Sequence, residues 1–180
     1  MLAIILCALP LAAHAKTPRV VATIPPIHSL VAMVLEGIAE PDLIVKGFAS
    51  PHDYAMAPSD ASKVAHAEKE HKHTHEHHHD GPDQHFWLSP ARAKQALELI
   101  ATALTETLPA QSQRINTNKE TALATLTALE TELKSVVDPI RGEQAVVLHD
   151  AYSQFTEHFG LKPLIALSIT PEHRPGPAQL

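Results

Sequence analysis

The sequence of 180 residues contains one cysteine, few aromatic residues and no cluster of basic residues. The cysteine, Cys7, lies in an N-terminal segment that we expect to be removed, which excludes a disulfide and a cysteine-ligated zinc site in the mature chain. Aromatic residues make up 4% of the chain and the net charge is −6, so neither base stacking nor phosphate binding is favoured. Nucleic acid is therefore not an expected partner, and metal ligands can come only from histidine, aspartate and glutamate.

What the chain does contain begins with an apolar N-terminal run that is typical of an export signal. Residues 2–13 are apolar but too few to span a bilayer. They lead into Ala13-His14-Ala15, a cleavage site of the A-x-A type. No lysine or arginine precedes the run, which departs from the usual signal-peptide pattern. The alternative to a signal peptide is a buried strand or helix at the N-terminus. We expect residues 1–15 to be a signal peptide.

The first part of the mature chain predicts an α/β lobe. The β-branched run in residues 18–26 predicts a strand that ends at Ile24, and residues 27–38 have the apolar spacing of a helix. Residues 42–48 predict a second strand, and Ser59 is a suitable N-cap for a short helix. This β-α-β order indicates parallel strands.

The middle of the chain predicts two helices. Ser89 and Pro90 suit the N-cap and first position of a helix that runs to about residue 104. After Pro109, a long polar helix is predicted over residues 111–137, with leucines at 123, 126, 129 and 133 on one face. This helix fits equally a surface helix and a connection between two lobes.

The last part of the chain predicts a strand, a helix and a second strand. The strands are residues 143–150 and 162–169, and the helix between them stops at Gly160. This unit is the beginning of a second α/β lobe whose apolar faces would lack partners. We therefore expect the chain to be incomplete at its C-terminus.

Histidine is the most unusual component of the chain, with 14 copies. Residues 68–84, here called the His-rich segment, have almost no apolar side chains to bury and are expected to form a disordered loop. Three other histidines have different neighbours. His52 follows a predicted strand, His85 lies four residues before a helix N-cap, and His149 is at the end of a strand.

These three histidines suit a zinc site. Ligands gather at the carboxyl ends of strands in α/β folds, and zinc accepts imidazole nitrogens in a four-coordinate shell that a carboxylate or water can complete. Calcium and magnesium prefer oxygen ligands. Each histidine taken alone is explained as well by an ordinary hydrogen-bonded role, because no H-E-x-x-H or paired i, i+4 motif is present.

Three motifs taken together resemble a known family. They are SPHDY-x-x-x-PSD from Ser50, H-x-WLSP from His85 and HDAY-x-x-F from His149. With their surroundings they resemble the periplasmic zinc-binding proteins of ABC transporters, the ZnuA type of the cluster A-I solute-binding proteins, over nearly all of the mature chain. The resemblance implies an α/β fold of two lobes joined by a long rigid helix, with one zinc ion in the cleft between them.

The resemblance also implies the site. It places the three zinc ligands on His52, His85 and His149, and a glutamate matches the position of His149 in related manganese binders. Histidine therefore favours zinc. Side chains expected next to the ligands are His28, Tyr54, Trp87 and Asp150. Weak zinc binding in the His-rich segment, which would collect zinc locally, is expected from His71, His73, His75, His77, His78 and His79.

Two departures from the family pattern are visible. The family continues after a stretch like residues 62–67 with a strand and a helix, whereas the His-rich segment follows here at once, so a piece of the first lobe is missing. The family's late aspartate, a possible fourth ligand, has no counterpart.

The predicted division of the chain into parts is a signal peptide (1–15), an incomplete N-terminal lobe (16–67), the His-rich segment (68–84), the remainder of that lobe (85–110), the connecting helix (111–139) and a truncated C-terminal lobe (140–180).

The resemblance implies a function without catalysis. We expect a monomeric periplasmic protein that captures Zn²⁺ with high affinity and delivers it to the membrane permease of an ABC transporter. One alternative is a periplasmic zinc buffer that acts through the His-rich segment, and another is manganese as the cargo. A zinc hydrolase that uses His52, His85 and His149 with a bound water is a third, but no carboxylate is clearly placed as its general base.

Overall fold

The computed structural model describes residues 19–47, 54–68 and 85–168. The predicted signal peptide, His52 and all but the start of the His-rich segment lie outside these residues. The described elements in chain order, with η for a 3-10 helix, are β1 (Val21–Ala22), α1 (Pro25–Val34), β2 (Asp42–Leu43), α2 (Pro58–Glu68), η1 (Phe86–Leu88), α3 (Pro90–Thr107), η2 (Pro109–Gln111), α4 (Ser112–Val137), η3 (Asp138–Ile140), β3 (Val146–His149), α5 (Ser153–Phe159) and β4 (Ile165–Ser168).

The first lobe is built on the predicted strand–helix–strand unit. β1 and β2 pair in parallel, with Val21 opposite Asp42, and α1 forms the crossover between them. Two prolines occupy the first positions of α1. Proline suits these positions because a backbone N–H in the first turn has no partner within the helix, so its absence costs no hydrogen bond. Both strands are much shorter than predicted. α1 ends before Gly37, whose φ of +70° is readily adopted by glycine and is incompatible with a right-handed helix.

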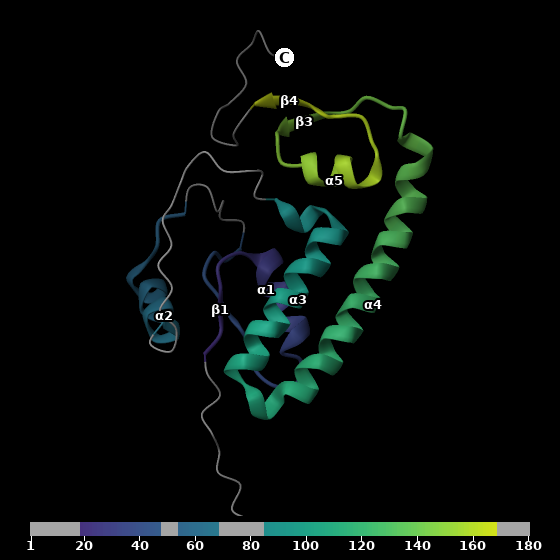
Figure 1. Ribbon diagram of the computed structural model, residues 1–180. Helices are drawn as coiled ribbons and strands as arrows, with labels where there is room; N and C mark the ends of the chain where they lie inside the picture. The colour runs from purple at the N-terminus through teal and green to yellow at the C-terminus, as the bar shows by residue number, and fades with distance from the viewer. Residues whose placement is uncertain (1–18, 48–53, 69–84, 169–180) are drawn as a thin grey trace, which may run out of the picture.

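The core of the molecule is formed by three helices. α3 and α4 lie side by side as an antiparallel hairpin joined by η2, and α1 packs against both (Figure 1). Apolar residues recur at helical spacing on the facing sides of these helices, which explains why the three pack around one shared core. The buried cluster consists of Leu30, Val31, Val34, Leu35, Leu97, Ala101, Leu104, Ile115 and Ala122.

A buried amide fixes the C-terminal end of α1 to α4. The Asn118 side chain donates hydrogen bonds of 2.9 Å to the carbonyl oxygens of both Val34 and Glu36. The last carbonyls of a helix have no partner within it, so Asn118 satisfies the Val34 carbonyl, which would otherwise be buried without a hydrogen bond.

Replacing Asn118 with alanine is expected to lower the free energy of unfolding by about 1–3 kcal/mol, because the Val34 carbonyl oxygen loses its donor while buried. Urea unfolding followed by circular dichroism measures the change. Asn116→Ala is the matched control, since Asn116 is exposed on the same helix and its loss is expected to change stability by less than about 0.5 kcal/mol. Equal effects of the two substitutions would contradict this role of Asn118.

α4 connects the two lobes. The N-terminal part of α4 packs on α1 and α3, where Leu123 and Leu126 border the core. Its C-terminal part reaches the second lobe, where Glu130 lies 2.8 Å from His158 on α5. Of the two interpretations of this long helix, the connecting helix is therefore correct. No helix in the described ranges is both long and apolar enough to cross a membrane.

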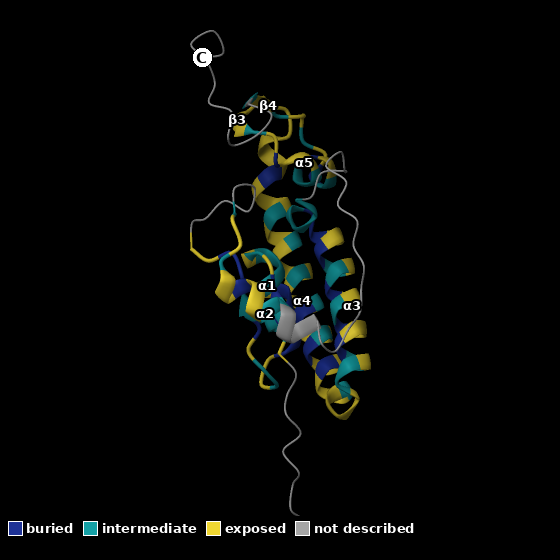
Figure 2. Cartoon of the chain, turned by 90° about the vertical axis from the view of Figure 1, so that its left-hand side faces the viewer, coloured by how far each residue is buried: buried dark blue, intermediate teal, exposed yellow. Residues whose placement is uncertain are grey.

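The second lobe is small and thinly covered. β3 and β4 pair in parallel, with Val146 opposite Ile165 and His149 opposite Ser168, and α5 lies against them. Buried residues are concentrated along α1, α3 and α4 (Figure 2). The residues of β3 and β4 and their surroundings are mostly exposed or intermediate. Val146, Leu148 and Ile165 are 58%, 60% and 52% exposed, so the prediction of apolar side chains without cover is confirmed.

Candidate metal centre

His85 is positioned by a short turn at the start of α3. The backbone N–H of Leu88 donates to the carbonyl oxygen of His85 at 3.0 Å, which closes the 3-10 turn of η1. The His85 ring lies edge-on to the Trp87 ring, with 5.4 Å between centroids. This contact restricts the rotation of the imidazole at the end of the first lobe.

His149 is positioned by the second lobe. It is the last residue of β3, so it stands at the carboxyl end of a strand, as predicted. The pairing with β4 extends to this residue and fixes its backbone. The Tyr152 ring lies beside the imidazole, at 6.5 Å between centroids, and Asp150 is exposed next to it.

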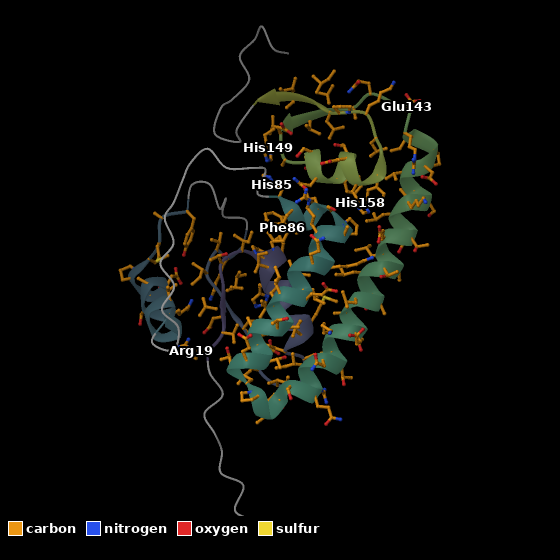
Figure 3. The ribbon with its side chains drawn as sticks, viewed as in Figure 1. Arg19, His85, Phe86, Glu143, His149 and His158 are labelled. Atoms are coloured by element: carbon orange, nitrogen blue, oxygen red, sulfur yellow. The ribbon has the colours of Figure 1, made fainter. Side chains whose placement is uncertain are left out.

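The two lobes bring His85 and His149 together. Their ring centroids are 6.1 Å apart with an interplanar angle of 61° (Figure 3). Zinc–nitrogen bonds of about 2.0–2.1 Å in a tetrahedral shell would bring two such centroids to roughly 5 Å. A shift of one ring by roughly 1 Å would therefore allow both to bind one ion.

The part of the motif that follows His52 is held by a polar cluster. The Tyr54 hydroxyl donates to the Asp60 carboxylate, and Lys63 donates to the same carboxylate at 3.0 Å. The hydrogen bond to Asp60 raises the pKa of Tyr54, and the hydrogen bonds from Tyr54 and Lys63 lower the pKa of Asp60. The cluster ties the residues just after His52 to α2.

The structure places the other predicted residues as follows. The His28 imidazole Nε2 lies 2.9 Å from the carbonyl oxygen of Pro41, a contact within the first lobe. The Trp87 ring contacts the His85 ring. His52 and the six loop histidines lie outside the described residues, and within the described ranges no group of three or more His, Cys, Asp or Glu could hold a metal ion.

Comparison with known proteins identifies the family. The family model of the periplasmic zinc-uptake complex component A, ZnuA, matches residues 20–69 and 66–180. The chain belongs to the ZnuA family. The two matches meet at residues 66–69, which is where the sequence predicts that a piece of the first lobe is missing.

A relative in the ZnuA family has residues that are missing from this chain. The high-affinity zinc uptake system protein ZnuA of Paracoccus denitrificans is 30% identical over 236 aligned positions, which cover 94% of this chain and 72% of the relative. Because the alignment is longer than the whole chain, the relative has residues between the aligned segments that have no counterpart here.

Solved structures confirm the predicted fold class, that of two-domain metal solute-binding proteins. The Zn(II)-bound ZnuA-like domain of Streptococcus pneumoniae AdcA has a TM-score of 0.70 at 19% identity, covering 91% of this chain and 72% of that domain. Fe(III)-bound YtgA of Chlamydia trachomatis has a TM-score of 0.76 at 16% identity, covering 89% and 73%. The fold is therefore shared by proteins crystallised with different metals.

Proposed function

We propose that the chain is the zinc-binding component of an ABC zinc-uptake system, which captures Zn²⁺ in the periplasm and delivers it to the membrane permease. The observation that carries this proposal is the pair formed by His85 and His149, one from each lobe, with 6.1 Å between ring centroids. The ZnuA relatives, which are named as components of high-affinity zinc uptake systems, support the same function.

The proposed site uses His52 as the third ligand. Imidazole nitrogens suit a borderline-soft ion, so the donor set favours zinc over manganese even though the fold itself accommodates several metals. Because His85 and His149 belong to different lobes, an ion bound to both holds the lobes together. Release to a permease then requires only that the second lobe move away from the first.

The His-rich segment has a separate role in this proposal. Its six clustered histidines would bind additional zinc weakly, since ligands that must be ordered on binding lose entropy. The segment would raise the local supply of zinc without forming part of the cleft site.

Zinc titration calorimetry on residues 16–180 tests the proposal. The unaltered chain is compared with a variant that lacks residues 68–80 and with one of full length in which the six loop histidines are replaced by asparagine. We expect one tight binding event per chain in all three, and loss of the weaker events in both variants.

Weak, multiple binding that disappears with the loop histidines would contradict the cleft site and favour the periplasmic zinc buffer instead. Competition with manganese in the same calorimeter decides the cargo. We expect excess manganese to leave the tight zinc event in place, and its displacement by manganese would contradict the zinc assignment.

A further inference from the structure

A hydrogen-bonded network joins the two lobes beneath the metal centre. On α5, the His158 ring has Nδ1 3.3 Å from the Ser89 hydroxyl and Nε2 2.8 Å from a Glu130 carboxylate oxygen. The other Glu130 oxygen accepts a 2.6 Å hydrogen bond from Lys94. We call these four residues the His158 network. It links α5 to the start of α3 and to α4.

The network holds the His158 ring in one orientation. Hydrogen bonds from Lys94 and from His158 lower the pKa of the Glu130 carboxyl, so Glu130 is an anion at neutral pH and accepts a hydrogen bond from Nε2. The other ring nitrogen then faces the Ser89 hydroxyl. With both nitrogens engaged and the ring edge packed on Phe159, at 4.7 Å between centroids, the ring has little freedom to turn.

Ser89 is used in an unusual way. It occupies the N-cap position of α3, where a serine hydroxyl ordinarily accepts a hydrogen bond from the first turn of the helix. Here the side chain makes no such bond, although the residue is only 4% exposed. The hydroxyl instead meets His158, which lies 69 residues further along the chain.

The His158 network lies next to the two elements of structure that carry His85 and His149. Ser89 lies four residues after His85 at the end of η1, and His158 is on the helix that directly follows β3 and His149. The network therefore acts on the two elements that carry the ligands.

We propose that His158 is a positioning residue of the metal centre, which holds α5 and β3 against the start of α3 and so sets the separation of His85 and His149. This inference rests on the proposed function, because it assumes that one ion bridges the two histidines. Without the network, the lobes would sample several separations and zinc would have to select one of them. We expect its loss to weaken zinc binding about 10-fold, within the usual range of coupling between two sites.

Two variants of His158 test this role. His158→Phe keeps a ring of similar shape and removes both hydrogen bonds, whereas His158→Gln retains a donor for Glu130 and an acceptor for Ser89. Glu157→Gln, an exposed change on the same helix, is the control. Zinc affinity is measured by competition with a chromophoric chelator, and thermal unfolding is followed in EDTA.

A distance measurement separates positioning from stability. The mature chain has no cysteine, so spin labels on Leu99→Cys and Leu148→Cys, both exposed and on different lobes, report one interlobe distance by pulsed electron paramagnetic resonance. Without zinc, His158→Phe is expected to broaden this distribution, whereas His158→Gln and the control leave it narrow. We expect about 10-fold weaker zinc binding in His158→Phe and near-normal binding in His158→Gln.

An unchanged distance distribution in His158→Phe would overturn the proposal, even if zinc affinity falls, because the effect would then be one of stability alone. Unchanged affinity in His158→Phe would overturn it as well. If the unaltered chain has no tight zinc event, the proposed function fails by itself. In that case the distance distribution in the metal-free protein still decides whether His158 positions the lobes.

Discussion

Replacing His149 with alanine is expected to weaken zinc binding in the cleft by about 100-fold. Apparent binding free energies of about 10–16 kcal/mol are typical of protein zinc sites with four ligands. The loss of one ligand of four removes roughly 3 kcal/mol, and every 1.4 kcal/mol is a factor of ten in affinity. His149 offers the only ligand from the second lobe in this proposal, so its loss also releases that lobe from the ion.

The measurement is a zinc competition titration on the variant without the six loop histidines, so that weak binding does not obscure the cleft site. Glu157→Gln is the control, because Glu157 is exposed on α5 and belongs neither to the proposed ligands nor to the residues expected beside them. We expect less than about a 3-fold change for this control, well below the 10–100-fold cost of losing a residue that orients a ligand. An affinity that survives in His149→Ala, or that falls equally in both, would contradict the proposed ligand set.

Replacing Leu97 with alanine is expected to lower the free energy of unfolding by about 2–5 kcal/mol. Leu97 is 0% exposed and belongs to the buried cluster that α1, α3 and α4 share. Its truncation removes apolar contacts and leaves a cavity that three packed helices cannot close. The expected loss is a large part of the stability of a small domain.

Leu99→Ala provides the comparison on the same helix. Leu99 is 72% exposed, so the same chemical change there is expected to cost less than about 0.5 kcal/mol. Urea unfolding of both variants in EDTA measures the difference without a contribution from bound metal. Similar values for the two leucines would show that the three-helix cluster is not the core of the protein.

The sequence predicts the helices better than the strands, and the reason is physical. α4 begins within one residue of its predicted start and ends at Val137 as predicted, because an apolar stripe at helical spacing and Pro139 are local signals. β1 is only two residues long, although residues 18–26 suggest a longer strand. A strand extends only as far as its neighbour, and that length is decided by tertiary contacts.

The metal centre likewise combines features that local sequence predicts with features that depend on tertiary contacts. The motifs around His85 and His149 are local, and the structure brings the two rings to 6.1 Å between centroids. That His52, His85 and His149 bind one zinc ion stays a prediction. His158 was not recognisable as a positioning residue, since its partners Ser89 and Glu130 lie 69 and 28 residues away in the sequence. Asp60 was visible only as part of the PSD motif, which does not reveal its bond to Tyr54.

The unequal packing of the two lobes has a thermodynamic consequence for the cargo. His85 stands on the buried three-helix cluster, whereas His149 stands on a two-stranded parallel sheet with exposed apolar side chains. Such a sheet is marginal by itself, so it opens locally far more often than the helices. A zinc ion shared by both histidines is then a cross-link for the second lobe. Part of its intrinsic binding free energy is spent on suppressing this local opening, which lowers the apparent affinity and makes the ion easier to give up.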